Sequence, residues 1–539
     1  MTEYQVEVVD TLCALPRGAA EDAPALVEVT DATSLTSVHV SYGLLRALSV
    51  RLADELYRCG VRAGDVVCFV HKNSIVFVVV FLAITRIGAT ASPLNPAYTA
   101  DEFAFYMEDM QAKLLLADEA GESPACVAAK RLGVRILTTS SSLTTASKEG
   151  STVGSVAIMP RDALQPREEA SSRAEPESIA MLLHTSGTTS RPKGVPISHK
   201  NLTASLANIA RTYELTTSDV TLLVMPLFHV HGLIAATLTT LASGGCVVIP
   251  PGGRFSASAF WPIAAKFHVS WYTAVPTIHQ VLLARAEAGT DGDVSFATAS
   301  LRFIRSCSSS LAPAILERVE ARFGAPVLEA YGMTEAAHQM SSNPLPKYGT
   351  RRAGTVGIGQ GVQIAILNNE TNESLPTGEI GEVCIRGDNV TRGYLNNEAA
   401  NESAFAAGWF HTGDQGKLDE DGFLTLTGRI KELINRGGEK ISPLELDAAL
   451  LAHEMVAEAV SFGAPDEKYG EAVNAAVVLV EGHSTSPSVE EDILNFVRSR
   501  LAPFKVPTRL FITDAVPKTA TGKIQRRFVA AHFLEGASA

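Results

Sequence analysis

Residues 184–194, HTSGTTSRPKG, decide how the rest of this chain is interpreted. They follow the apolar run IAMLL at 179–183, which predicts a buried strand. Glycines in such a loop let backbone N–H groups turn toward phosphate oxygens, hydroxyls donate further hydrogen bonds, and Lys193 supplies positive charge. The loop is not a Walker A loop, because Lys193 is followed by Gly194 rather than by Ser or Thr. Composition alone leaves an ordinary Ser/Thr-rich turn open as the alternative.

Composition places the chain among folded globular proteins and sets limits on its partners. Apolar residues make up 46% and charged residues 19% of 539 residues, a length that predicts more than one domain. The net charge of -13 argues against nucleic acid as a partner and requires any polyanionic substrate to be held by local cations and backbone dipoles. The seven cysteines include no CxxC pair, which argues against a disulfide framework or a structural zinc site.

No targeting signal is visible in the sequence. The start, MTEYQVEVVD, lacks a basic and an apolar region, and the end, GASA, is not an SKL-type peroxisomal address. The most apolar run, 75–84, is shorter than the roughly 20 residues that a membrane-spanning helix needs. We therefore predict a cytoplasmic protein without a membrane span, with peroxisomal localisation disfavoured, and leave its oligomeric state open between monomer and dimer.

Periodicity outward from the loop predicts an α/β protein. Apolar spacing indicates a helix at 42–57, a strand at 66–70 and a buried helix at 74–86. Strands and helices alternate from 179 to about 427, with strand-like runs at 222–225, 245–250 and 269–273. The Ser/Thr-rich segment 139–176 is predicted to be a surface excursion.

A domain boundary is predicted at Gly428. Beyond it, Ser442, Pro443 and Glu445 have the pattern of a helix N-terminus, with Ser as the cap and Pro at the first position. The predicted architecture is a large multi-subdomain N-terminal α/β domain, 1–428, and a small mobile C-terminal α+β domain, 429–539.

The string 184–194 resembles the phosphate-binding signature of the adenylate-forming superfamily, which includes acyl-CoA synthetases, peptide-synthetase adenylation domains and firefly luciferase. Further motifs of that superfamily follow in its order along the chain: YGMTE at 331–335, HTGD at 411–414, GRIKE at 428–432 and PKTATGKI at 517–524. Chance occurrence of these motifs in this order is negligible.

The resemblance implies an AMP-forming acid–CoA ligase that uses ATP, CoA and Mg²⁺. A carboxylate that attacks the α-phosphorus of ATP brings two anions together, and the catalytic Lys523 would bridge them. Glu335 would act in catalysis by holding magnesium together with Thr188. The implied ATP- and AMP-binding residues are Thr185, Ser186, Gly187, Thr188, Thr189, Lys193, Ser309, Glu329, Ala330, Tyr331, Gly332, Thr334, Asp414 and Arg429.

In relatives of this superfamily the small domain rotates between two half-reactions. The resemblance places the hinge at Lys431 and puts Gly437, Gly438, Glu439 and Lys440 on the CoA side. The alternative for these four residues is an ordinary turn that precedes the helix at Ser442.

Longer stretches resemble the oxalate–CoA ligases of plants and fungi more than the 4-coumarate–CoA ligases. They are PLFHVHGLIAATL at 226–238, GRFSASAFWP at 253–262, WYTAVPTIHQ at 271–280, RSCSSSLAP at 305–313 and EAYGMTEAAHQMSSNPLP at 329–346. His229, His231, Ser308 and His338 are the candidate pocket residues, because histidines and a serine suit the second carboxylate of oxalate. His231 as a hydrogen-bonded core histidine is the alternative.

Three other functions share the motifs. One is a 4-coumarate-like, malonate or other short- to medium-chain carboxylate–CoA ligase. Another is an adenylation module that loads a carrier protein, which is disfavoured because no carrier domain follows Lys523. The third is a luciferase-like oxidase of the adenylate, which only an oxygen-dependent product would reveal.

Overall fold

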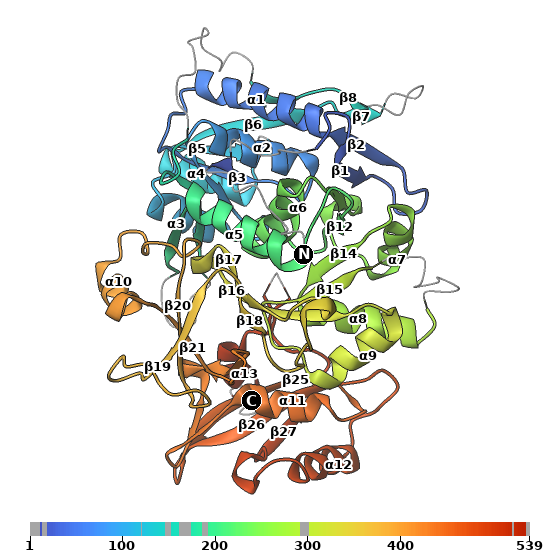
Figure 1. The fold of residues 1–539 in the computed structure, drawn as a ribbon, viewed down its shortest axis with the longest axis vertical. Helices are drawn as coiled ribbons and strands as arrows, with labels where there is room; N and C mark the ends of the chain where they lie inside the picture. The colour runs from blue at the N-terminus through green and yellow to red at the C-terminus, as the bar shows by residue number, and fades with distance from the viewer. Residues whose placement is uncertain are drawn as a thin grey trace.

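The computed structural model of this protein describes residues 11–12, 19–119, 121–145, 152–160, 174–185, 192–290, 301–519 and 522–534. Figure 1 shows the N-terminal two thirds of the chain, blue to yellow, above a smaller orange to red part that contains the last strands and helices. Helices flank the sheets of the upper part, so the predicted α/β class is confirmed.

A nine-stranded sheet positions the site, and its central strands are parallel. Across the sheet the strands are β18 (Ile358–Gly359), β17 (His338–Ser342), β16 (Val327–Met333), β15 (Phe303–Ser306), β14 (Trp271–Ala274), β12 (Val220–Leu222), β13 (Cys246–Ile249), β1 (Pro24–Val29) and β2 (Ser37–Ser41). Because β14, β15 and β16 run in one direction, the loops that follow them meet at one edge of the sheet.

A seven-stranded sheet forms the second layer of the large part. Its order is β11 (Gly194–Ser198), β10 (Ile179–His184), β4 (Thr90–Pro93), β3 (Val66–Val70), β5 (Leu114–Ala117), β6 (Arg135–Ser141) and β9 (Val156–Met159). A short pair, β7 (Thr144–Thr145) and β8 (Thr152–Val153), lies apart from it. The candidate phosphate loop connects β10 to β11, which pair antiparallel.

Two smaller sheets complete the chain. One contains β19 (Gln363–Leu367), β20 (Gly381–Arg386), β21 (Phe410–Leu418) and β22 (Leu424–Arg429). The other contains β24 (Glu439–Ile441), β23 (Ile434–Arg436), β26 (Gly470–Leu479) and β25 (Val456–Asp466), with β27 (Arg509–Ile512) parallel to β26. The last strand of the first small sheet and the first strand of the second are only a few residues apart in the chain.

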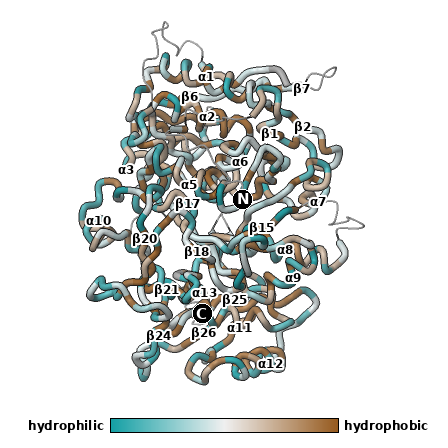
Figure 2. Tube along the Cα trace, viewed as in Figure 1, coloured by the Kyte–Doolittle hydropathy of each residue, from teal (hydrophilic) through white to brown (hydrophobic). Residues whose placement is uncertain are grey.

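Helices cover these sheets. They are α1 (Tyr42–Arg58), α2 (Ile75–Arg86), α3 (Ala100–Asp109), α4 (Pro124–Leu132), α5 (His199–Tyr213), α6 (Thr239–Ala242), α7 (Ala257–Lys266), α8 (Pro276–Glu287), α9 (Pro313–Phe323), α10 (Glu398–Ala404), α11 (Pro443–Leu451), α12 (Pro487–Arg498) and α13 (Arg526–Leu534), with a π-helix at His231–Leu238. Figure 2 shows α2 as a brown, hydrophobic segment beneath α1. Its residues are nearly all buried, and no described helix is long and apolar enough to cross a membrane.

Local sequence signals placed several elements correctly. The predicted helix at 42–57 is α1, and the helix at 74–86 is α2, whose N-terminus is capped by Ser74. The predicted helix start at Ser442 is also confirmed, because its hydroxyl accepts the backbone N–H of Glu445 at 3.2 Å. These signals act within one turn of helix, which is why sequence alone reveals them.

Two predictions were wrong. The strand predicted at 222–225 ends at Leu222, since the following residues turn toward the π-helix that begins at His231. The segment 139–176 is not only a surface excursion: β9 pairs with β6, and Val156 and Ile158 are buried against the sheet. In both segments the secondary structure depends on tertiary packing, which the local periodicity of the sequence does not indicate.

Candidate functional site

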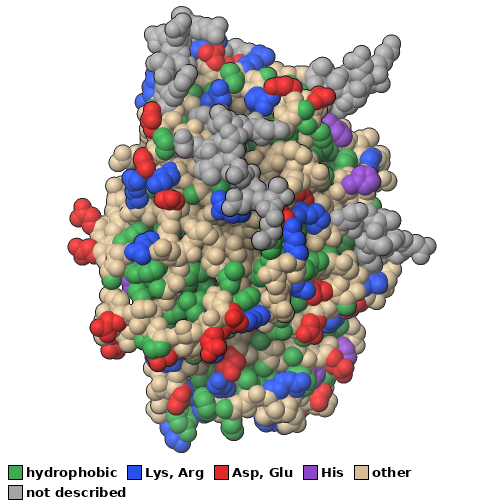
Figure 3. Space-filling model, in the orientation of Figure 1, with side chains coloured by type: hydrophobic (Ala, Val, Ile, Leu, Met, Phe, Trp, Pro, Cys, Tyr) green, Lys and Arg blue, Asp and Glu red, His purple; other side chains and the backbone are tan. Residues whose placement is uncertain are grey.

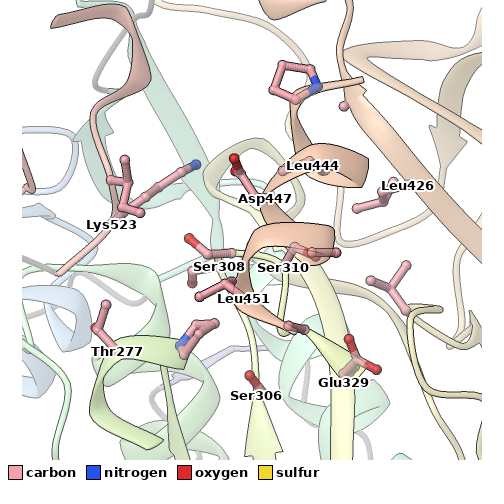
Figure 4. Close-up of a pocket in the computed structure, with 18 of the residues that line it drawn as sticks. Thr277, Ser306, Ser308, Ser310, Glu329, Leu426, Leu444, Asp447, Leu451 and Lys523 are labelled. Atoms are coloured by element: carbon pink, nitrogen blue, oxygen red, sulfur yellow. The ribbon is translucent and has the colours of Figure 1, made fainter. Parts of the chain in front are cut away.

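A pocket lies where the loops after β14, β15 and β16 meet the C-terminal part of the chain (Figure 4). In that view Ser308 and Ser310 lie near the centre, Asp447 of α11 lies above them, Lys523 reaches in from the left and Glu329 lies at the lower right. The predicted residues among its lining are Ser308, Ser309, Glu329, Ala330, Tyr331, Gly332, Asp414, Arg429 and Lys523. Segments more than two hundred residues apart in the sequence therefore share one pocket.

Asp414 and Arg429 form an ion pair in the lining of this pocket. The pairing of β21 with β22 places the two residues opposite each other, and Arg429 Nε lies 3.0 Å from Asp414 Oδ1. Tyr331 donates its hydroxyl to the other oxygen of Asp414. The neighbouring Asp414 raises the pKa of Arg429, which keeps the guanidinium charged beside it.

Glu329 is a buried carboxyl group that also lines the pocket. It lies on β16 directly beside Ser306 of β15, and its Oε2 accepts the backbone N–H of Gly354 at 3.0 Å. Burial raises the pKa of Glu329 to about 8, and the hydrogen bond from Gly354 lowers it by less than burial raises it. The group is therefore protonated at neutral pH and presents an O–H as well as an acceptor.

Lys523 enters the pocket on a short loop of the C-terminal part. Lys518 and Ile524 form an isolated β-bridge, and the Lys523 backbone N–H donates to Thr519 Oγ1 at 3.1 Å. Its side chain is reached by solvent because the pocket is open, yet the surrounding protein lowers its pKa, first through burial and then through Arg429.

Lys523 is held there by contacts across the two parts of the chain. Thr277 Oγ1 at the start of α8 donates to the Gly522 carbonyl at 3.5 Å, and Gln280 Nε2 donates to the Ala457 carbonyl at 3.3 Å. Both distances are long for hydrogen bonds, so these two bonds are weak.

A second cluster surrounds Glu335, beside the pocket. Its Oε1 accepts the hydroxyl of Tyr394 at 2.9 Å, and the ammonium of Lys193 lies 4.4 Å from the Tyr394 ring centre. Burial raises the pKa of Glu335. A cation beside this carboxylate would offset that cost, so an oxygen-binding divalent ion such as Mg²⁺ fits here.

The candidate phosphate loop is described only at its two ends. The Thr185 backbone N–H donates to the Lys193 carbonyl at 3.0 Å, which closes the base of the loop. Ser186, Gly187, Thr188 and Thr189 lie outside the described residues.

The predicted acyl residues His231, Ser308 and His338 are brought together. His231 Nδ1 lies 3.1 Å from Ser308 Oγ, and the rings of His231 and His338 are 5.0 Å apart. Both histidines are buried, and burial followed by the charge of Arg305 holds each pKa well below the ordinary value. The two histidines are therefore neutral, polar groups. Together with Ser308 they form one polar wall next to the pocket.

His229 lies between this wall and Lys523. Its Nδ1 accepts the His231 backbone N–H at 3.1 Å, and burial together with Lys523 lowers its pKa to about 4. Gly332 makes room for His338: a Cβ on this glycine would come within 2.0 Å of the His338 carbonyl oxygen.

Some predicted residues are not in the pocket lining. Thr334 begins the 3-10 turn Thr334–Ala336, and Lys431 is exposed at the turn between β22 and β23. Gly437, Gly438, Glu439 and Lys440 are exposed as well. They do not form a turn directly before a helix, because Gly437 and Gly438, both with positive φ, join β23 to β24 as a hairpin.

Sequence analysis missed several lining residues. Asp447 on α11 accepts from Arg526 at 2.7 Å, and Thr277 contacts the lysine loop, but neither carries a local motif. Arg305 and Thr273, behind the histidines, were overlooked too. Arg305 had a signal: a charged residue inside the apolar strand 303–306 is unusual unless it has a specific role.

Surface charge does not by itself mark this site. On the face in Figure 3 acidic and basic side chains are interspersed. The protein has a net charge of -13, so an anionic ligand in the pocket depends on the local cations Lys523, Arg429 and Lys193.

Comparison with known families gives two matches. The model of the AMP-binding enzyme family matches residues 17–395, and the model of the AMP-binding enzyme C-terminal domain matches residues 445–523.

Similar proteins extend over almost the whole chain. An oxalate–CoA ligase from Arabidopsis thaliana is 51% identical, covering 98% of this chain and 99% of its own. An oxalate–CoA ligase from Saccharomyces cerevisiae is 44% identical, covering 87% of each chain. Among solved structures, ATP-bound MatB from Rhodopseudomonas palustris has a TM-score of 0.84 at 29% identity and covers 97% of this chain and 99% of its own.

The Glu329 carboxyl group should make stability depend on pH. Above the ordinary carboxyl pKa the unfolded chain has lost the proton that the folded state keeps up to its pKa of about 8. The wild-type protein therefore loses stability as the pH rises through this window, whereas Glu329→Gln has no such proton to lose. Melting temperatures at pH 5 to 9 should show the variant gaining on the wild type as pH increases. A pH-independent difference would contradict a protonated Glu329.

Proposed function

The chain belongs to the AMP-binding enzyme family, and on that premise we propose that it is an oxalate–CoA ligase. It would convert ATP, oxalate and CoA into AMP, pyrophosphate and oxalyl-CoA through an oxalyl-adenylate. The observation that carries the proposal is the wall of neutral hydrogen-bonding groups, His231, Ser308 and His338, beside the pocket that Lys523 enters. The two relatives named oxalate–CoA ligases support the same acid.

The polar wall suits a small diacid better than an aromatic one. Oxalate has a carboxylate at each end, so one can react while the other receives hydrogen bonds from the wall. A coumarate ring or a long acyl chain would need an apolar cleft instead. Ser308 lines the pocket and contacts His231, so the wall is continuous with the space that Lys523 shares.

Adenylation requires charge to be cancelled along the line of attack. In our proposal the ammonium of Lys523 lies between the attacking carboxylate and the α-phosphate and stabilises the charge that develops there. The phosphates would be held by the N–H groups and hydroxyls of the loop, Thr185, Ser186, Gly187, Thr188 and Thr189, and by Lys193.

The nucleoside would bind beside the ion pair. Asp414 would accept hydrogen bonds from the ribose hydroxyls, and Arg429 would contact the ribose. Tyr331, Ala330 and Gly332 would face the adenine, with Ser309 and Glu329 nearby. The contact with Arg429 would orient the Asp414 carboxylate toward two hydroxyl donors.

Mg²⁺ would be held by Glu335 and Thr188, with Thr334 in the adjoining turn. Bound there, the ion shields the phosphate charges. Tyr394 orients the Glu335 carboxylate by its hydrogen bond.

Thiolation would follow a rotation of the C-terminal domain, 429–539, about Lys431 relative to 1–428. The long bonds Thr277–Gly522 and Gln280–Ala457 would be inexpensive to break. Arg526 pairs with Asp447 and with Glu432 within the moving part, so that part can rotate as one body. Rotation would withdraw Lys523 and bring Gly437, Gly438, Glu439 and Lys440 toward CoA.

The deciding experiment is a CoA-dependent AMP-release assay with oxalate beside malonate, acetate and 4-coumarate. We expect the highest kcat/KM with oxalate. A higher value with 4-coumarate or malonate would assign the chain to another acid, and no AMP release with any acid would exclude ligase activity.

Lys523→Ala should separate the two half-reactions. Loss of the ammonium removes charge stabilisation from adenylation only, so oxalate-dependent pyrophosphate exchange should fall at least about 100-fold. Conversion of preformed oxalyl-adenylate to the thioester should change by no more than a few fold. Lys468→Ala, an exposed lysine of the same domain, serves as the matched control. An equal loss in both half-reactions would contradict the role given to Lys523.

His338→Ala should weaken oxalate binding without disturbing ATP. Removing one donor to a carboxylate raises the KM for oxalate by about 10-fold or more, while the KM for ATP stays unchanged. His483→Ala, an exposed histidine far along the chain, controls for loss of an imidazole. If the oxalate KM of His338→Ala equals that of the control, His338 does not belong to the acyl pocket.

A further inference from the structure

Arg305 is a fully buried charge in the centre of the nine-stranded sheet. It lies on β15 and has 0% exposure. Its guanidinium donates to neutral groups: Tyr213 Oη at 2.8 Å, Thr273 Oγ1 at 3.0 Å, Gln339 Oε1 at 3.1 Å and His338 Nδ1 at 3.4 Å. It forms no ion pair with any residue that the structure describes. An arginine stays protonated, so this buried positive charge has no counter-ion within the described part of the chain.

The first branch from Arg305 runs through Thr273 to Ser308. The β14–β15 register places Thr273 beside Arg305, whose N–H donates to the threonine oxygen. The threonine hydroxyl hydrogen then has His231 Nε2, at 2.6 Å, as its acceptor among the described contacts. His231 therefore carries its proton on Nδ1 and donates it to Ser308 Oγ at 3.1 Å. The Ser308 hydroxyl is left free to donate into the pocket.

The second branch runs through His338. An arginine N–H can only donate, so His338 Nδ1 is the acceptor and the imidazole proton resides on Nε2. The ring stands 5.0 Å from that of His231, on the same wall. Both branches thus begin at one cation and end in donors, a hydroxyl and an imidazole N–H, on the wall where an anion would bind.

Backbone conformation at the two ends of these branches is unusual. Ser308 has φ 73° and His338 has φ 96°, in the left-handed region that L residues rarely adopt. Such conformations persist only where surrounding contacts enforce them, and they concentrate at ligand sites. In both residues the side chain also takes part in one of the two branches.

We propose that Arg305, acting through Thr273, His231 and His338, is the positioning residue that makes the enzyme select an acid with a second carboxylate. The inference rests on the proposed function and names the group that gives it specificity. A diacid brings the missing negative charge close to Arg305, whereas a monoacid leaves the buried cation uncompensated. The free enzyme already carries the uncompensated cation, so a diacid gains affinity from Arg305 and a monoacid gains none, which is how a polar site discriminates against analogues that lack a partner group.

The test compares oxalate with acetate and glyoxylate, which lack the second carboxylate, in the AMP-release assay. Arg305→Met keeps the side-chain bulk and removes the charge. We expect its kcat/KM for oxalate to fall about 100-fold, mainly through KM, while the values for acetate and glyoxylate change by less than about 3-fold. An equal fall for all three acids, or an unchanged preference, would overturn the proposal.

Thr273→Val tests the same idea without removing the arginine. It interrupts the branch to His231 and should raise the oxalate KM about 10-fold while sparing acetate. Thr221→Val is its matched control, because Thr221 is a buried threonine of neighbouring β12 whose hydroxyl bonds Thr240 at 2.7 Å. If Arg305→Met does not fold, as judged by its melting curve, the Thr273→Val and Thr221→Val pair decides the matter. Equal oxalate KM values for these two variants would refute the relay.

The wild-type protein in the same assay separates this inference from the proposed function. If it releases no AMP with oxalate, the proposed function fails. If it uses oxalate and Arg305→Met keeps the same oxalate-to-acetate ratio, the role of Arg305 alone fails.

Discussion

Removal of water from charged groups is the constraint on which this site depends. Inside the protein a carboxylate, an ammonium or an imidazolium loses its hydration, so each group must be paired, neutral or compensated by a ligand. Two of these solutions occur within one region, together with one buried charge that has neither among the described residues. Asp414 pairs with Arg429, Glu329 keeps its proton, and Arg305 remains charged among neutral neighbours. The positive charge of Arg305 therefore has no negative partner among the described residues, and this favours the binding of an anion.

The sheet arrangement explains how these groups meet. Neighbouring parallel strands place Thr273 beside Arg305 and Ser306 beside Glu329, so their loops open at one edge. The antiparallel pair β21–β22 sets Asp414 opposite Arg429. Strand register, which is fixed over the whole sheet, therefore aligns chemical groups that come from separate segments. Lys523 arrives from a different part of the chain, whose hydrogen bonds to α8 are long enough to permit movement.

Much of the fold was predictable because its signals are local. The cap pattern at Ser442 predicted the helix that follows it, and the alternation of apolar runs indicated an α/β protein. Contiguous motifs likewise marked Asp414, Arg429 and Lys523. The segment around Val156 and Ile158 was misjudged, since two short apolar side chains gain a place in a core only when a strand such as β6 is available to pair with them. For the glycines at 437–438, the alternative of a turn directly before a helix was wrong, because strand β24 intervenes.

The sequence by itself determined the family motifs, the helix caps and the residue types that suit phosphate and carboxylate chemistry. Only the tertiary structure decided that Arg305 stands behind His231 and His338 without an acidic partner among the described residues, and that Glu329 is buried enough to keep its proton. The physical reason is that charge state and hydrogen-bond direction depend on distance and burial. Both are properties of residues that pack together from distant parts of the chain, and no short stretch of sequence contains them.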